Sequence, residues 1–128
     1  MITETDKIFL RIAEQVAQLS DHPEFKVGAV IANGCGVQHK ITSTGFNIQG
    51  KYHAEELAIG FLRRDSETIY VSHPPCHDCA MSMLNVGINR VVWLKQEDEF
   101  MLRWKNSNDE AKRLFDKYGV KWDMYDDR

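Results

Sequence analysis

Two short motifs constrain this chain more than any other feature of its sequence, because their side chains suit a shared metal ion and must then meet in space. The first is His53-Ala54-Glu55, and the second is Pro75-Cys76-His77-Asp78-Cys79. Cysteines three residues apart on a helix share a face, and proline suits the turn that starts a helix. We therefore expect Cys76 and Cys79 at a helix N-terminus, where the helix dipole favours the thiolate form of both side chains.

The first motif supplies the rest of the predicted site. His53 is expected to give a third, nitrogen ligand, and three protein ligands leave the fourth position of a tetrahedral Zn2+ ion for water, as in catalytic zinc sites. Glu55 lies two residues beyond His53 and is not needed as a ligand, so its carboxylate can stand beside the bound water and move protons. The sequence thus predicts zinc as cofactor, with a purely structural zinc site as the alternative.

Around these motifs the apolar pattern alternates between helix and strand periodicity. The expected elements are a helix over 5–19, a hairpin of Val27–Ala32 and Val37–Phe46 joined by a turn at Asn33–Gly36, a helix over Ala54–Arg64, a strand Thr68–Val71, a helix Cys76–Val86 stopped by Gly87, a strand Val91–Leu94, a helix Trp104–Tyr118 ended by Gly119, and a strand Val120–Tyr125. This order predicts an α/β fold, a mixed sheet between helices whose later strands are parallel. With 128 residues and no linkers or repeats, residues 1–128 are expected to form a single domain.

Charge and composition exclude several classes of protein. The net charge of −3 gives no general attraction to a polyanion, which argues against a long nucleic acid as partner. No apolar run approaches the ~20 residues that cross a bilayer, so no membrane partner is expected. The start of the chain carries Glu4 and Asp6 without a basic leader, so we expect a cytoplasmic protein. Three cysteines, two of them at metal spacing, make disulfides unexpected, and Cys35 is interpreted as a bystander thiol.

Other polar and aromatic residues have less specific interpretations. His73 is expected to line a pocket, His77 to lie beside the ligands or at the surface, His22 and His39 to be surface residues, and Glu56 to be solvated. Either Lys26 or Lys51 could hold a phosphate, because both flank segments that should converge on the pocket. The tryptophans Trp93, Trp104 and Trp122 are expected in the core or in subunit contacts. The alternating charges between Arg103 and Lys121 indicate a solvated helix face.

Both motifs together, in this order, resemble the H-x-E and P-C-x-x-C signature of zinc deaminases. The chain resembles the deoxycytidylate (dCMP) deaminase family of the zinc-dependent cytidine deaminase superfamily over nearly its whole length. The segments that carry the likeness are Lys26–Ile31, Thr44–Asn47, Thr68–Val71, Pro75–Ala80, Gly87–Val92, and Trp104 with its following helix. The resemblance implies a three-layer α/β/α sandwich with a five-stranded mixed sheet, the cytidine deaminase-like fold, and assembly into homo-oligomers.

The resemblance also implies roles for individual residues. His53, Cys76 and Cys79 would hold zinc, and Glu55 would take a proton from the activated water and pass it to ring N3 of a cytosine while C4 is attacked. The resemblance further implies three substrate-binding positions, namely Asn47 on the sugar, Val27 on the base and the Ala54 amide on the ring carbonyl. Lys26 is a fourth expected substrate-binding residue because of its place beside the pocket segments, with a solvated surface lysine as the alternative. The expected partner is a small-molecule nucleotide, with dCMP converted to dUMP and ammonia for thymidylate synthesis.

Two departures from the family pattern concern the substrate region. Ile48 stands where the family has glycine, and the following loop is shortened to Gln49-Gly50-Lys51-Tyr52. The alternatives that stay open are deamination of free cytidine or deoxycytidine, of a 5-substituted dCMP, or of adenosine in transfer RNA. A further alternative is a catalytically silent, zinc-bound interaction module, against which the intact Glu55 argues.

Overall fold

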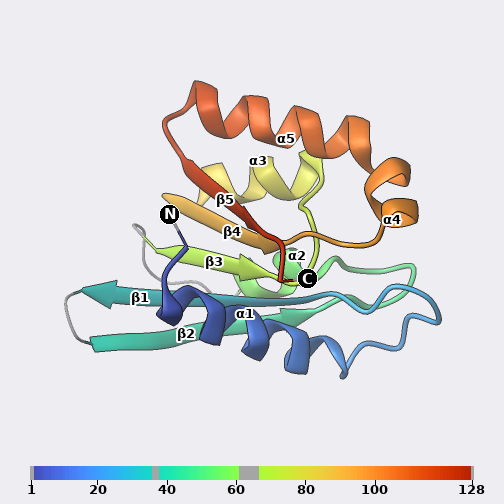
Figure 1. The fold of residues 1–128 in the computed structure, drawn as a ribbon, viewed down its shortest axis with the longest axis horizontal. Helices are drawn as coiled ribbons and strands as arrows, with labels where there is room; N and C mark the ends of the chain where they lie inside the picture. Colours follow the sequence, from blue (N-terminus) through green and yellow to red (C-terminus); the bar gives the residue numbers. More distant parts are fainter. Residues whose placement is uncertain (1, 36–37, 61–66, 128) are drawn as a thin grey trace.

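The computed structural model describes residues 2–35, 38–60 and 67–127 of the chain, shown in Figure 1. In chain order its elements are α1 (Glu4–Ala17), β1 (Gly28–Cys35), β2 (Gln38–Phe46), α2 (Ala54–Gly60), β3 (Thr68–Val71), α3 (His77–Asn85), β4 (Arg90–Leu94), α4 (Asp98–Arg103), α5 (Lys105–Lys117) and β5 (Lys121–Tyr125). None of the helices in these described ranges is long and apolar enough to cross a membrane.

The strands form one five-stranded sheet in the order β2-β1-β3-β4-β5. β1 pairs antiparallel with both β2 and β3, whereas β3, β4 and β5 run parallel to one another. The predicted mixed sheet with a parallel second half is therefore confirmed. In a parallel arrangement the strands need crossover connections, and α3 and α5 supply them here.

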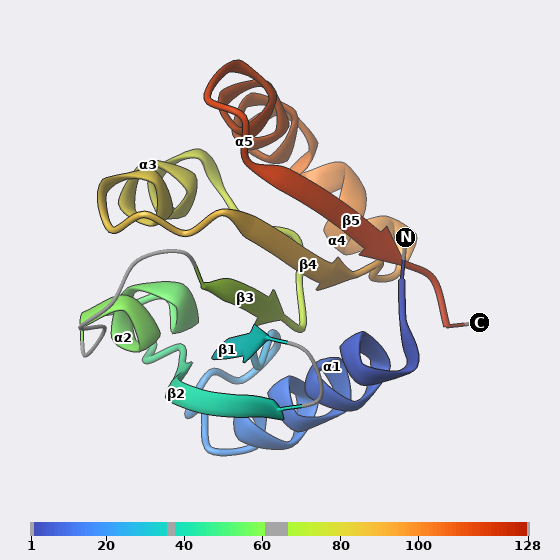
Figure 2. The same ribbon diagram turned by 90° about the vertical axis from the view of Figure 1, so that its left-hand side faces the viewer.

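Helices cover both faces of the sheet, as Figure 2 shows. On one face α1 packs through Phe9, Leu10 and Ala13 in a core that includes alternate residues of β1, β3 and β4. On the other face α2, α3 and α5 enclose a second core, whose largest fully buried side chains include Trp93 and Phe115. Because successive strand residues point to opposite faces, each central strand contributes to both cores, which gives the predicted three-layer sandwich.

Several element boundaries differ from the sequence-based expectation. Residues Asn33–Cys35 continue β1 instead of forming a turn, because they pair with Lys40, His39 and Gln38 of β2; the hairpin connection itself falls at residues 36–37, outside the described residues, as do residues 61–64 of the predicted helix. The structure adds a short helix, α4, immediately before α5. Gly87 and Gly119 stand at the predicted helix ends with φ angles of 81° and 73°, which glycine adopts without strain.

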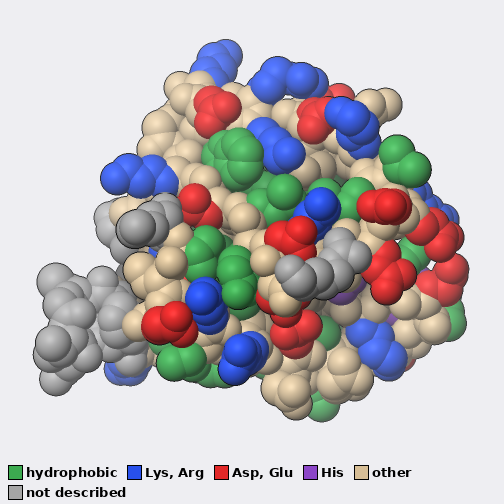
Figure 3. All heavy atoms as spheres, in the orientation of Figure 1, with side chains coloured by type: hydrophobic (Ala, Val, Ile, Leu, Met, Phe, Trp, Pro, Cys, Tyr) green, Lys and Arg blue, Asp and Glu red, His purple; other side chains and the backbone are tan. Residues whose placement is uncertain are grey.

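The charged face of α5 agrees with its interpretation as a solvated helix face. Lys105 pairs with Asp109 four residues later, and Lys112 approaches the same carboxylate. Basic and acidic side chains are interspersed on the face of the molecule seen in Figure 3, including the part formed by α5. An even mixture of signs does not attract a polyanion.

Candidate metal centre

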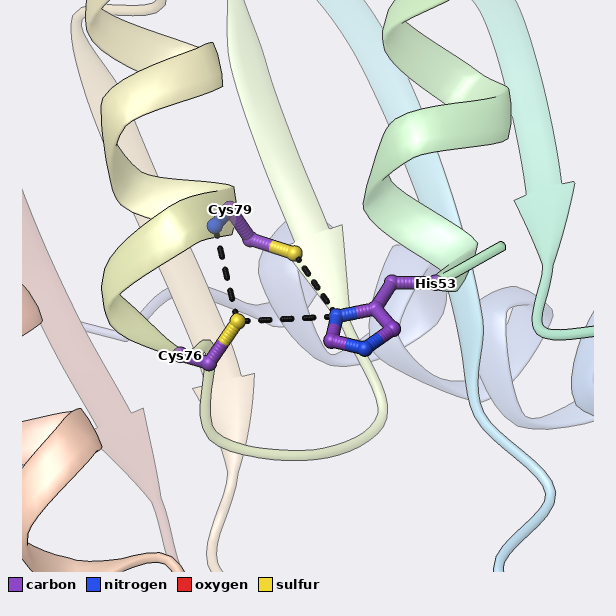
Figure 4. Close-up of side chains that lie close together, drawn as sticks. All are labelled: His53, Cys76 and Cys79. Carbon is purple, nitrogen blue, oxygen red and sulfur yellow. Dashed lines mark hydrogen bonds between the residues drawn. The ribbon is translucent and has the colours of Figure 1, made fainter. Parts of the chain in front are cut away.

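Three side chains from two helix N-termini meet at one end of the sheet. Nδ1 of His53 lies 3.2 Å from Sγ of Cys79 and 3.5 Å from Sγ of Cys76, and the ligand atoms of the three residues all lie within 4.8 Å of one another. Figure 4 shows the imidazole of His53, next to α2, pointing at the two sulfurs at the start of α3. The predicted constellation is thus assembled by the fold.

The cysteines are positioned by the start of α3 and by contacts from α5. Cys76 is the N-cap of α3, where its sulfur accepts a hydrogen bond from the backbone N–H of Cys79. From α5, the buried Asn108 donates to the carbonyl of Pro75 at 3.0 Å, and the hydroxyl of Ser107 accepts from the backbone N–H of His77. These bonds hold the turn before α3 in place, so both sulfurs face the same point.

The geometry fits a zinc ion. Ligands of one tetrahedral zinc, with Zn–S near 2.3 Å and Zn–N near 2.0–2.1 Å, stand about 3.6 Å apart. The nitrogen–sulfur separations of 3.2 and 3.5 Å are close to that edge length. The donor set of one imidazole and two thiols also suits zinc, and three protein ligands leave one position for a small molecule.

The thiols and the imidazole influence one another's protonation. A hydrogen bond from the Cys79 thiol, together with one from His53, lowers the pKa of Cys76 to about 4. The Cys76 thiolate and burial in turn raise the pKa of Cys79 above its ordinary value. A hydrogen bond to Cys76 raises the pKa of His53 to about 9. A bound dication would take the place of these shared protons, because metal coordination favours both thiolates and the neutral imidazole.

Glu55 lies beside the three ligands on the first turn of α2. Its side chain is only 4% exposed, and burial raises the pKa of its carboxyl to about 7. The neighbouring Glu56 is exposed and accepts a hydrogen bond from the backbone N–H of His53 at 2.8 Å. The two adjacent glutamates therefore have different environments: Glu55 is buried beside the metal ligands, and Glu56 caps the helix from outside.

A cavity of about 350 Å³ opens next to His53, Glu55 and Cys76, within the size range of small-molecule sites. Three of the predicted substrate-binding residues, Val27, Asn47 and Ala54, line it. Lys26 is not among the described lining residues, and its ammonium group donates to the carbonyl of Ser20 at 2.6 Å. This placement does not support the predicted substrate contact of Lys26.

Asn47 connects the cavity to the segment before β1. Its side-chain oxygen accepts from the backbone N–H of Val27 and its amide donates to the carbonyl of Phe25, both at 2.8 Å. Its carbonyl accepts from the hydroxyl of Ser20. These hydrogen bonds fix the part of the cavity wall that includes Val27. The side-chain amide of Asn47 has a second hydrogen, which it can donate to a ligand.

Part of the cavity wall is aromatic and was not predicted from the sequence. Phe100 from α4 packs edge-on against Phe25 at 5.2 Å and against His73 at 4.8 Å, with Trp104 at 6.2 Å on its other side. His22, expected at the surface, also lines the cavity, and its Nδ1 accepts from the backbone N–H groups of Glu24 and Phe25. The predicted pocket position of His73 is confirmed.

The tryptophans divide between core and cavity. Trp93 is fully buried and stacks on Trp122 with centroids 5.3 Å apart. Trp104 is 37% exposed and borders the cavity, a place that its sequence context did not indicate.

Comparisons with known proteins agree with this geometry. Residues 3–95 match the family described as the cytidine and deoxycytidylate deaminase zinc-binding region. The chain is 34% identical to an uncharacterised deaminase from the luxG 3′ region of Aliivibrio fischeri, covering 94% of this chain and 92% of that protein. It is 28% identical to the deoxycytidylate deaminase of Mycobacterium phage D29, covering 71% of this chain and 94% of the phage protein.

A solved structure shares the fold. The dCMP deaminase of cyanophage S-TIM5, in complex with dCMP and dUMP, superimposes with a TM-score of 0.76 at 20% identity, covering 98% of this chain and 99% of the other. The fold of this chain is therefore that of a cytidine deaminase-like domain.

Proposed function

Because this chain belongs to the cytidine and deoxycytidylate deaminase family, we propose that it deaminates a cytosine nucleotide hydrolytically, converting dCMP to dUMP with release of ammonia. Two relatives support dCMP as the substrate. The phage D29 relative is named a deoxycytidylate deaminase, and the cyanophage enzyme of the same fold was solved with dCMP and dUMP.

One observation carries the proposal. A buried carboxylate, Glu55, and the three atoms that suit a zinc ion border the same cavity. A structural zinc site is closed by four protein ligands and has no use for a buried carboxylate beside it. This arrangement favours catalysis over the silent interaction module.

The residues of the chain have distinct tasks in the proposed reaction. His53, Cys76 and Cys79 would hold zinc, which would supply an activated water whose pKa is lowered toward ~7. Glu55 would take a proton from that water and deliver it to ring N3 of cytosine while the water oxygen bonds to C4. Glu55 would then move the remaining hydroxyl proton to the amine at C4, so that the C–N bond breaks and ammonia leaves. The backbone N–H of Ala54 meets the ring carbonyl, Val27 packs on the base, and Asn47 donates to the sugar.

The substrate class is tested by measuring ammonia release from the zinc-loaded protein with dCMP, CMP, 5-methyl-dCMP, deoxycytidine, cytidine and an adenosine-containing anticodon stem-loop. The proposal expects the highest kcat/KM for dCMP. A higher kcat/KM for a free nucleoside, for the 5-substituted nucleotide or for the stem-loop would show that this compound, and not dCMP, is the preferred substrate. Stoichiometric zinc without turnover of any of them would contradict an enzyme and favour the interaction module.

The proposal includes two further properties, a cytoplasmic location and assembly into a homo-oligomer. The first rests on the sequence, and the second on the family resemblance. Light scattering coupled to gel filtration tests the assembly, and a monomer at micromolar concentration would contradict it.

A further inference from the structure

A buried hydroxyl fixes the orientation and protonation of a histidine in the cavity wall. Ser72 follows the last residue of β3, and its Oγ accepts a hydrogen bond from the backbone N–H of Gly28 at 2.9 Å. The same Oγ lies 2.8 Å from Nδ1 of His73. Between this hydroxyl and this ring nitrogen, either group can be the donor, and the direction of the bond depends on the tautomer of His73.

The environment of Ser72 decides the direction. A serine hydroxyl has one hydrogen to donate, and Ser72 is only 2% exposed, so water cannot take that hydrogen. Among the described residues, the acceptor that this hydroxyl meets with hydrogen-bond geometry is Nδ1 of His73. If His73 donated instead, the buried hydroxyl hydrogen would be left without an acceptor, which is unfavourable. Ser72 therefore donates, and Nδ1 of His73 carries no hydrogen.

With Nδ1 accepting, the single hydrogen of the neutral imidazole sits on Nε2. Burial lowers the pKa of His73 to about 4, which keeps the ring neutral at physiological pH. The edge-on contact with Phe100, with ring centroids 4.8 Å apart, restricts rotation of the His73 imidazole. Nε2 has no hydrogen-bond partner among the described residues, and the ring lines the cavity, so this N–H is the polar group that His73 offers to a ligand.

We propose that His73 is a specificity-determining residue that presents its Nε2–H to the base of the bound nucleotide. The inference rests on the proposed function. His73 stands three residues before Cys76 in the segment that leads to the metal ligands, and the base is the part of the substrate that must reach those ligands. A neutral N–H suits an uncharged ring acceptor such as a carbonyl oxygen or ring nitrogen, whereas the phosphate is better matched by a cation.

Two variants separate the hydrogen bond from the packing. His73→Phe keeps an aromatic ring against Phe100 and removes the donor, whereas His73→Gln keeps a donor. The affinity for dUMP, measured by calorimetry, is expected to fall about tenfold in His73→Phe, the size of one neutral hydrogen bond, and to recover partly in His73→Gln. His77→Phe is the control, because His77 is paired with Asp78 outside the cavity, and its affinity should match the wild type. Equal affinity of His73→Phe and wild type would overturn the inference.

The tautomer is measured in the wild-type protein, which avoids any folding defect of the variants. In a long-range proton–nitrogen NMR spectrum of histidine-labelled protein, His73 should show an unprotonated Nδ1 and a protonated Nε2, and dUMP should shift the Nε2 signal. A hydrogen on Nδ1, or an Nε2 signal that stays unchanged while dUMP binds, overturns the inference alone. Absence of binding by every pyrimidine nucleotide overturns the proposed function and this inference with it.

Discussion

His53 and Cys79 bring Nδ1 and Sγ to 3.2 Å of each other although they are 26 residues apart in the chain. His53 directly precedes α2, and Cys79 is buried in the first turn of α3. Because α2 and α3 both pack on the same core as β1 and β3, the metal site is part of the fold.

Removal of one sulfur ligand is expected to empty the site and weaken the fold. Cys79→Ser should lower the zinc affinity by more than about 100-fold, because a hydroxyl is a far poorer zinc ligand than a thiolate. Metal binding adds to folding stability, so the melting temperature of the variant should fall to that of chelator-treated wild type. His77→Ala is the matched control, since His77 lies outside the ligand set; wild-type zinc content in Cys79→Ser would refute the assignment.

The two adjacent glutamates are expected to differ sharply in function. Glu55→Gln should keep zinc and fold and lower kcat by about 10²–10⁴-fold, the usual contribution of a general acid–base group. Glu56→Gln should leave kcat near the wild-type value, because Glu56 is exposed and its side chain can still accept the hydrogen bond from His53 N–H. Comparable losses of kcat in both variants would show that the proton-transfer role is wrongly placed.

The monophosphate is expected to be recognised by Lys51 and not by Lys26. Lys51 is the one Lys or Arg among the described residues that line the cavity, whereas Lys26 donates to Ser20. Lys51→Ala should raise KM for dCMP about fivefold, as for an exposed charged contact, without changing KM for deoxycytidine. Lys26→Ala should change KM for dCMP and KM for deoxycytidine by the same factor. A selective loss of dCMP affinity in Lys26→Ala would restore the sequence-based prediction for Lys26.

The two motifs of the candidate metal centre can be read from the sequence because the information in each motif is local. The spacing of Cys76 and Cys79 fixes their shared helix face, and a histidine two residues before an acidic residue is visible without any tertiary structure. The same holds for the strand at Thr68–Val71, whose short apolar run is bounded by polar residues at both ends. Each motif taken singly, and this strand, can be read from neighbouring residues alone.

The aromatic wall could not be predicted in this way. Phe100 lies in α4, Trp104 lies between α4 and α5, and both side chains line the cavity. The six residues of α4 are too few to show a clear helical period in the sequence. His22 reaches the cavity because its Nδ1 caps two backbone N–H groups of its own loop, a task that the sequence suggests only for aspartate, asparagine or serine. These positions depend on tertiary contacts, which single-sequence patterns do not encode.

The ion pair of Asp6 and Arg90 is expected to make the free energy of unfolding depend on pH. Burial alone would raise the pKa of Asp6, but hydrogen bonds from Arg90, Thr3 and Tyr70 outweigh it and hold this pKa well below the ordinary 3.8. A carboxylate with a depressed pKa in the folded state stabilises the fold above its unfolded pKa and loses that effect as pH falls through the folded value. The contribution of Asp6 is therefore complete at pH 7 and declines below about pH 4.

Asp6→Asn tests this dependence. The variant should be less stable at pH 7 by about 2–3 kcal/mol, since it leaves the guanidinium of Arg90 with weaker partners. Urea unfolding at pH 7, 4 and 3 should show the difference from wild type narrowing as the pH falls. Asp109→Asn, which removes an exposed ion pair with Lys105, serves as control and should change little at any pH. A difference that stays constant from pH 7 to pH 3 would contradict the depressed pKa.

Gly45 of β2 lies directly against the backbone of α2. A Cβ atom at this position would meet the carbonyl oxygen of Ala54 and lie 2.5 Å from the backbone nitrogen of Ala58. Both are backbone atoms of the helix that follows His53 and carries Glu55, so Gly45→Ala must displace that helix, at a cost of about 1–3 kcal/mol. Gly60→Ala changes a residue of the same helix where an added Cβ would meet no atom of the described residues within 4 Å, and it should be neutral or slightly stabilising. Zinc affinity and kcat should fall together in Gly45→Ala and stay unchanged in Gly60→Ala; a Gly45→Ala protein with wild-type stability and zinc affinity would show that the position of α2 does not set the metal site.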